Sequence, residues 1–109
     1  MKGSYLGEVA SLILTIVGMT EKTNAVEIHE LLKEILGRDV HPGVRYNAMK
    51  RLEEDEMLVI GREIMERIDT RMRISYQLSE KGLKQFNTEQ AARERLQKIG
   101  KKRYKKQIF

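Results

Sequence analysis

The sequence contains no cysteine, which excludes both a disulfide framework and a thiolate zinc site. Long apolar runs are also missing, because the longest one, residues 12–19, is much too short to span a bilayer. The N-terminus lacks the charged start, apolar run and small-residue cleavage site that together mark a secretory signal. These absences predict a protein of a reducing compartment, located in the cytoplasm and without a membrane partner.

Acidic residues are absent from residues 98–109, although the chain is otherwise rich in both charges. This segment holds six basic residues, namely Lys98, Lys101, Lys102, Arg103, Lys105 and Lys106. The remaining 15 basic residues face 16 acidic ones, so the net charge of +5 belongs to the C-terminal segment. It is interpreted as an arm on a nucleic-acid backbone or as a solubilising tail. A membrane-surface patch is disfavoured, since one Tyr and one Phe make a weak anchor.

Two helices are predicted in the first third of the chain. Residues 5–19 have apolar side chains at a helical period, although the β-branched residues in their second half also permit a buried strand. The second helix, residues 24–36, has Asn24 as a cap, Glu27 in the capping-box position and Gly37 as a left-handed stop. Its exposed side is glutamate-rich and would repel phosphate, so this helix is expected to support and not to contact DNA.

Residues 41–58 are the most informative segment. Pro42 fits the first position of a helix over about residues 42–55, where its missing N–H costs nothing. An apolar stripe follows at helical spacing, formed by Val44, Ala48, Met49 and Leu52. Arg51 is at the flank of this stripe, whereas Arg45 falls on the apolar side near the helix start. An acidic stop, residues 53–56, then leads into a strand.

The opposite side of this third helix presents Tyr46, Asn47 and Lys50. A helix fits the major groove of DNA, where an amide can read adenine and a cation can read guanine or contact phosphate. An ordinary amphipathic helix would also have a polar side. The DNA-reading interpretation is favoured because this face has no acid before Glu53, the helix is third in order, and a hairpin follows it.

Residues 58–64 and 71–78 are predicted to form that hairpin. The second strand alternates, with Met72, Ile74, Tyr76 and Leu78 on one face and Arg71, Arg73, Ser75 and Gln77 on the other. Period two with one apolar face indicates a half-buried strand. Arg71 and Arg73, with Arg67 near the tip, suit contacts to phosphate or the minor groove. A solvated face with cross-strand ion pairs is the alternative, because acidic residues are close by.

The rest of the chain is predicted to be helical, first from a cap at Ser79 to Phe86 and again from Thr88 to about Arg103. Five residues form an apolar seam: Leu83, Phe86, Ala92, Leu96 and Ile99. No nucleophile is paired with a base and no glycine-rich phosphate loop follows a strand, so an enzyme is not expected. The two histidines, His29 and His41, lack partners at metal-ligand spacing, so neither a metal nor another cofactor is expected.

Four segments in order resemble the PadR family of winged-helix transcriptional regulators, over roughly residues 5–86. They are Leu6-Gly7-Glu8, NAVEIHELLKEILGRDV, GVRYNAMKRLEEDEML and RMRISYQLSEKGL. The most specific pieces are Gly43, Tyr46, the run from Arg51 to Glu54, and the Tyr76-x-Leu78-Ser79-x-x-Gly82 ending. Departures from the family are Arg45 at a usually apolar position, Glu56 in place of glycine, and a wing without glycine between Arg62 and Gly82. No Trp is available for stacking on planar ligands.

The resemblance implies a mainly α-helical fold with a small β-hairpin wing and with N-terminal and C-terminal dimerisation helices. Residues 1–86 would form the winged helix-turn-helix domain, and residues 87–109 would form a C-terminal helix with a basic tail. It implies a homodimer that reads a pseudo-palindromic operator in double-stranded DNA. Repression is released by a small-molecule effector in some members of the family, but no residue here supports one. The DNA-contacting positions correspond to Tyr46, Asn47, Lys50, Arg51, Arg71 and Arg73.

The sequence therefore predicts a homodimeric, sequence-specific DNA-binding regulator, most simply a repressor. Two alternatives stay open. A winged-helix adaptor would contact protein through the same helix and wing, and the near-neutral body favours it. The second alternative is non-specific nucleic-acid binding through residues 98–109, which would need neither the third helix nor the wing.

Overall fold

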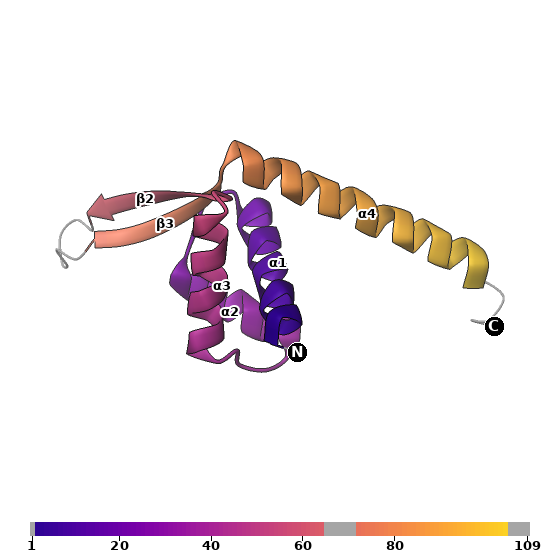
Figure 1. The fold of residues 1–109 in the computed structure, drawn as a ribbon, viewed down its shortest axis with the longest axis horizontal. Coiled ribbons are helices and arrows are strands. Elements are labelled where there is room, and N and C mark those ends of the chain that lie inside the picture. Colours follow the sequence, from indigo (N-terminus) through magenta and orange to yellow (C-terminus); the bar gives the residue numbers. More distant parts are fainter. Residues whose placement is uncertain (1, 65–71, 105–109) are drawn as a thin grey trace.

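The computed structural model describes the backbone of residues 2–64 and 72–104, with side chains for residues 7–61 and 74–102. The elements in order are α1 (Lys2–Thr20), β1 (Thr23–Asn24), α2 (Ala25–Leu36), α3 (Pro42–Glu54), β2 (Leu58–Ile64), β3 (Met72–Leu78) and α4 (Glu80–Tyr104). Helices α1, α2 and α3 form a head, from which the β2–β3 hairpin and α4 project in opposite directions (Figure 1). The predicted winged helix-turn-helix class is confirmed.

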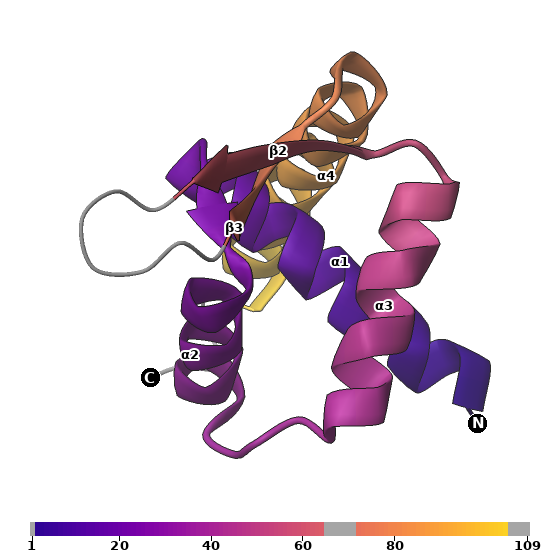
Figure 2. The ribbon, with the colours of Figure 1, turned by 90° about the vertical axis from the view of Figure 1, so that its left-hand side faces the viewer.

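Residues 5–19 belong to a helix and not to the alternative strand. Helix α1 is apolar on more than one side, and it contacts α2, α3, β3 and α4. Figure 2 shows it crossing α3 with α2 beside them. Its Ile13 and Val17 are completely buried, and the other buried core residues are Val9, Ala10, Leu14, Ile16, Ile28, Leu32, Val40, Ala48, Leu52 and Leu58. Among the described residues, no helix has the length and apolar character that crossing a membrane requires.

The cap at Asn24 and the glycine stop of α2, and the proline start of α3, are confirmed. The Oδ1 atom of Asn24 accepts a hydrogen bond from the Glu27 backbone N–H, and Gly37 adopts φ 69° at the C-terminus of α2. The Glu27 carboxylate accepts from the hydroxyl of Thr23, one residue before the cap. Helix α3 begins at Pro42, and His41 caps it because its Nδ1 accepts from the Gly43 backbone N–H at 3.0 Å.

The sheet has the order β1-β3-β2, with both pairs antiparallel. The predicted hairpin is present, but the two-residue strand β1 was not predicted. One expectation for β3 is wrong: Ser75, assigned to the exposed face, is 7% exposed, and Ile74, assigned to the apolar face, is 41% exposed. Ser75 is buried because β3 is the central strand and Asn24 and Gly61 are its neighbours. Ile74 lies beyond the end of β1 and lacks that cover.

Helix α4 is continuous from Glu80 to Tyr104, so the prediction of two separate helical stretches around residue 87 is wrong. Its start is capped as predicted, because the Ser79 hydroxyl accepts from the Gly82 N–H at 3.0 Å. The same hydroxyl donates to the Glu56 carbonyl at 2.6 Å, and the Ser79 N–H donates to the Met57 carbonyl. These bonds tie the start of α4 to the segment between α3 and β2.

Gly82 sits where α4 passes that segment at close range. A Cβ atom at this position would lie 2.1 Å from the Met57 carbonyl oxygen, which is backbone and cannot rotate away. Glu56, next to Met57, adopts φ 59°, the left-handed conformation that favours glycine. The close approach to Met57 explains why position 82 is glycine, as in the family pattern. Glu56 adopts a backbone conformation that glycine adopts more readily.

We predict that Gly82→Ala lowers the free energy of unfolding by about 1–3 kcal/mol, the usual cost of forcing extra volume into a packed site. Gly100→Ala is the matched control, because nothing lies within 4 Å of a Cβ there. In the middle of a helix that change should raise stability by up to about 1 kcal/mol. Urea unfolding followed by circular dichroism measures both. Equal effects of the two substitutions would contradict the close approach at Gly82.

Candidate nucleic-acid interface

Helix α3 presents a polar surface to solvent. Ala48 is completely buried and Leu52 is 6% exposed, and together they fix this helix against α1. Tyr46, Asn47 and Lys50 are exposed on the side away from α1, and Tyr46 keeps 67% of its surface accessible. The helical-wheel expectation is confirmed for these three residues: their side chains are free to meet a partner that approaches α3.

Arg51 is exposed as well, but it lies on a different side of α3. Its Nη1 is 3.8 Å from where a Cβ of Gly7 would lie, so its guanidinium reaches the beginning of α1. Arg51 also lines a shallow depression that includes residues of α1 and the α4 residues Gln85 and Glu89. The structure therefore groups Arg51 with α1 and α4, apart from Tyr46, Asn47 and Lys50.

Arg45 faces the turn before α3. Its Nε donates a hydrogen bond to the Val40 carbonyl oxygen at 3.2 Å, and the residue is half-buried. This bond gives a polar side chain on the apolar side of α3 a structural role: it links the helix start to the preceding turn. His29, from α2, lies 3.4 Å from Asp39 in the same turn. In the part of the chain that the structure describes, no three His, Cys, Asp or Glu side chains group as a metal site.

The wing can be compared with the predictions only in part. Arg73 pairs with Glu63 in the register of the hairpin, so it has a cross-strand acidic neighbour along the backbone. The side chain of Arg73 and all of Arg67 and Arg71 lie outside the described residues. At the other end of the molecule, Lys98, Lys101 and Lys102 are exposed on α4, which extends away from the head (Figure 1).

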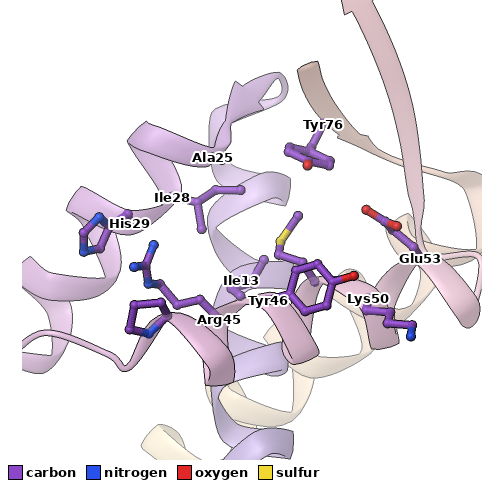
Figure 3. Close-up of a pocket in the computed structure, with 11 residues that line it drawn as sticks. Ile13, Ala25, Ile28, His29, Arg45, Tyr46, Lys50, Glu53 and Tyr76 are labelled. Atoms are coloured by element: carbon purple, nitrogen blue, oxygen red, sulfur yellow. The ribbon is translucent and has the colours of Figure 1, made fainter. Parts of the chain in front are cut away.

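A cleft of about 380 Å³ opens between α2, α3 and β3. Its lining residues are Ile13, Ala25, Ile28, His29, Pro42, Arg45, Tyr46, Met49, Lys50, Glu53 and Tyr76. Figure 3 shows Tyr46 from α3 and Tyr76 from β3 on different sides of this space. Two of the exposed α3 residues, Tyr46 and Lys50, thus belong to the cleft as well as to the outer surface. The sequence did not reveal the cleft, and its one local indication was a cation, Arg45, on an apolar side.

Tyr76 has an altered acidity in this setting. Its burial, and secondly the negative charge of Glu53, raise the pKa of its hydroxyl above the ordinary value. The phenol consequently stays protonated over a wider pH range and keeps an O–H donor at the cleft. The sequence placed Tyr76 on the apolar face of β3 and in the family-like ending around Ser79, and did not associate it with a cleft.

Solved structures share this arrangement of elements. A PadR-like transcription factor from Bacteroides fragilis has a TM-score of 0.71 and 24% identity, over 89% of this chain and 90% of its own. The chain has a PadR-like winged-helix fold. A transcriptional regulator from Clostridium thermocellum has a TM-score of 0.66 and 18% identity, covering 94% and 96% of the two chains. RosR from H. salinarum has a TM-score of 0.63 and 20% identity, covering 84% and 86%.

No protein-family model and no curated protein matches the sequence significantly. The PadR-like fold nevertheless explains why the four sequence segments occur in their order. The second segment is α2 with its turn, the third is α3 with its acidic stop, and the fourth is β3 with the start of α4. The resemblance seen in the sequence is confirmed at the level of the fold.

We predict that Glu53→Gln lowers the pKa of Tyr76, because it removes the negative charge that disfavours the phenolate. The pKa should stay above the ordinary value for tyrosine, since burial is the larger cause. A pH titration of ¹³C-labelled tyrosine rings by NMR measures this shift. Glu54→Gln, a change of an exposed neighbour, is the control and should leave Tyr76 unchanged. An unaltered Tyr76 titration in Glu53→Gln would contradict the assignment.

Proposed function

We propose that the chain is a homodimeric, sequence-specific DNA-binding transcriptional regulator that acts in the cytoplasm, most simply as a repressor. The observation that carries this proposal is the exposed surface of α3 on a PadR-like fold. Tyr46, Asn47 and Lys50 lie outward on the third helix, beside a hairpin, with no acidic residue before Glu53. A helix with such side chains can enter the major groove and meet base edges.

The proposed contacts divide into two kinds. Tyr46, Asn47 and Lys50 discriminate between bases, whereas Arg51, Arg71 and Arg73 contact the DNA backbone or the minor groove and supply affinity. Arg51 reaches toward α1. With α3 in the major groove, Arg51 would contact the DNA backbone next to that groove. Contacts to phosphate release counterions, and binding should therefore weaken steeply as salt concentration rises.

Dimerisation is supported by the uncovered part of α4. Leu96 is 70% exposed and Ile99 is 52% exposed, on a segment of α4 that extends away from the head (Figure 1). Large apolar side chains at this spacing on one helix favour burial against another helix. In a two-fold dimer formed this way, the two α3 helices would read half-sites separated by about one turn of DNA, roughly 34–36 Å.

The test is a selection of bound sequences from a random duplex library with the full-length protein. A second protein, with Lys101, Lys102, Arg103, Lys105 and Lys106 replaced by Gln, is selected in parallel. We expect the same pseudo-palindromic motif from both. No enrichment from the full-length protein would favour the adaptor, which needs no operator. Binding without a motif, lost in the Gln variant, would assign all of the affinity to the basic tail.

We predict that Lys50→Ala reduces discrimination between the selected operator and random DNA by about 1–3 kcal/mol, the range for a good base contact. Lys81→Ala, a change at an exposed position on the first turn of α4, is the matched control and should leave discrimination unchanged. Fluorescence anisotropy at several salt concentrations measures both. If Lys50→Ala weakens operator and random DNA equally, Lys50 contacts phosphate and does not read a base.

We also predict that the double substitution Leu96→Glu and Ile99→Glu converts a dimer into a folded monomer. The new charges would be buried without partners at a helix–helix interface, whereas both positions are exposed in the single chain. Sedimentation over a concentration series measures the association, and circular dichroism checks the fold. Lys98→Glu on the same turn is the control for added negative charge. A wild-type chain that is monomeric at tens of micromolar would contradict the proposed dimer.

A further inference from the structure

One side of helix α4 carries a row of exposed cations. The row, here called the α4 basic stripe, consists of Lys84, Arg95, Lys98 and Lys102. At about 100° per residue these four positions fall within a sector of roughly 60°, and at about 1.5 Å per residue they span about 27 Å of the helix. The acidic residues between Lys84 and Lys102, Glu89 and Glu94, fall outside that sector. The stripe is therefore a continuous basic surface on a straight element.

Packing of α4 on the head leaves the stripe in solvent. Three α4 residues make the contacts with α1, namely Phe86, Glu89 and Arg93. By helical periodicity these residues lie opposite the stripe, about half a turn away. Leu96 and Ile99, which the proposed dimer would bury, lie about a quarter of a turn from the stripe. The stripe consequently stays accessible in the single chain and in that dimer.

The cations of the stripe also lack partners, in contrast to other cations of the molecule. Lys33 lies 3.8 Å from Asp39, and Arg45 donates to the Val40 carbonyl oxygen. Within the part of the chain that the structure describes, no hydrogen bond or ion pair involves a side chain of the stripe. Lys98 and Lys102 are four residues apart on the helix, a spacing at which like charges repel each other. A partner with several negative charges would relieve this repulsion.

The residues around the cations favour a phosphate backbone as that partner. The neutral residues between Lys84 and Arg95 on this side of α4 are Asn87, Thr88 and Ala91, of which the first two can donate hydrogen bonds to phosphate oxygens. A helix that binds a membrane surface would present a broad face of large apolar side chains, and the stripe has none. Duplex DNA carries closely spaced phosphates and is bound through cations alone. Its chemistry is complementary to the whole stripe.

The stripe is remote from the surface proposed to read an operator. Figure 1 shows the β2–β3 hairpin and α4 projecting from the head in opposite directions, and the longest dimension of the molecule is 59 Å. An operator held by α3 and the hairpin would lie on the hairpin side of the head. Attraction to phosphate is screened beyond about 8–10 Å at physiological salt. Arg95, Lys98 and Lys102, on the far part of α4, would therefore meet a different stretch of DNA.

We propose that the α4 basic stripe binds the phosphate backbone of a second DNA duplex, so that the protein bridges an operator and a non-operator segment. Binding at the stripe is independent of base sequence, because cations that meet phosphates carry no sequence information. The bridging half of this inference rests on the proposed function, since it needs α3 to hold the operator. The stripe itself needs only α4, and the proposed homodimer would carry two stripes.

The test measures capture of a second duplex by a protein that already holds the first. The selected operator is fixed to beads as a short duplex, loaded with the full-length protein and washed. A fluorescent duplex of scrambled sequence is then added. We expect loaded beads to retain the scrambled duplex and beads with operator alone to retain none. Retention should fall steeply with salt, because each phosphate contact contributes about 0.9 to the slope of log affinity against log salt concentration.

A triple variant removes the stripe on the far part of α4. Arg95→Gln, Lys98→Gln and Lys102→Gln together should lower retention of the scrambled duplex by roughly tenfold or more and reduce the salt slope by about 2.7. Affinity for the short operator should not change. All three positions are exposed and Gln is a good helix former, so the fold should be kept. The control for charge is Lys101→Gln, Lys105→Gln and Lys106→Gln, which removes the same number of cations and should retain the scrambled duplex nearly as the wild type does.

Three results would overturn the proposal. Equal losses in the two triple variants would assign the effect to net charge and not to the stripe. An absence of retention, together with binding of the wild type to vesicles of phosphatidylserine and phosphatidylcholine, would assign the stripe to a membrane. A loss of affinity for a long operator duplex in the stripe variant, without capture of a second duplex, would place the stripe on the flank of the same DNA.

Failure of the proposed function can be distinguished from failure of the stripe. If no operator is selected, the proposed function and the bridging half fail together. Fluorescence anisotropy of the scrambled duplex with the wild type and both triple variants then still tests the stripe. Weaker binding in the stripe variant alone supports it, and equal binding by all three proteins contradicts it.

Discussion

Burial of α1 is the constraint on which the rest of the structure depends. This helix supplies half of the buried core residues, and α2, α3, β3 and α4 all pack against it. Each fully buried aliphatic side chain contributes about 1.5–3 kcal/mol. The position of α3, and with it the outward direction of Tyr46 and Lys50, therefore depends on apolar contacts made on the opposite side of the helix.

A second constraint connects the head to α4. The Ser79 hydroxyl and N–H, together with the close approach of Gly82 to Met57, hold the start of α4 against the segment that follows α3. Further along, Phe86 packs so closely on α1 that a Cβ at Gly18 would lie 2.5 Å from its ring. Ser11 donates to Glu89 at 2.6 Å, and Arg93 donates to Thr15 at 3.2 Å. These contacts fix the angle between α4 and α3, and in a dimer built on α4 this angle sets the distance between the two reading helices.

Much of the fold could be predicted because its boundaries depend on local chemistry. Asn24, Gly37 and Pro42 mark helix ends through bonds and dihedral angles that involve only neighbouring residues. Asn87 and Thr88 are residue types that often cap helices, and they suggested an interruption near residue 87. The interruption was wrong because each of these residues costs less than about 1 kcal/mol inside a helix. Contacts of Phe86, Glu89 and Arg93 with α1 lie on both sides of this pair and keep the helix continuous.

What could not be predicted depends on elements distant in sequence. Ser75 is buried because Asn24 pairs with it, and a two-residue strand has no periodicity from which to recognise it. The cleft combines side chains from α1, α2, α3 and β3, so no single segment carries its pattern. Arg45 was the one residue whose position on the wheel disagreed with its chemistry. The structure explains this disagreement in two ways: Arg45 donates a hydrogen bond to the Val40 carbonyl oxygen, and it lines the cleft. Neither contact can be inferred from the sequence, because both depend on how the turn and α2 are placed relative to α3.

The basic residues that would attract DNA lie in a different part of the chain from the α3 side chains proposed to recognise bases. The head and hairpin are close to neutral, whereas the excess of basic residues belongs to residues 98–109. Exposed Lys98, Lys101 and Lys102 lie on the part of α4 that extends away from α3 (Figure 1). Attraction to phosphate acts over about 8–10 Å at physiological salt, so in the proposed complex with DNA these cations would act beyond the base pairs next to α3. A near-neutral head would hold non-specific DNA weakly, so specific affinity in the proposed complex would depend on the α3 side chains that meet base edges.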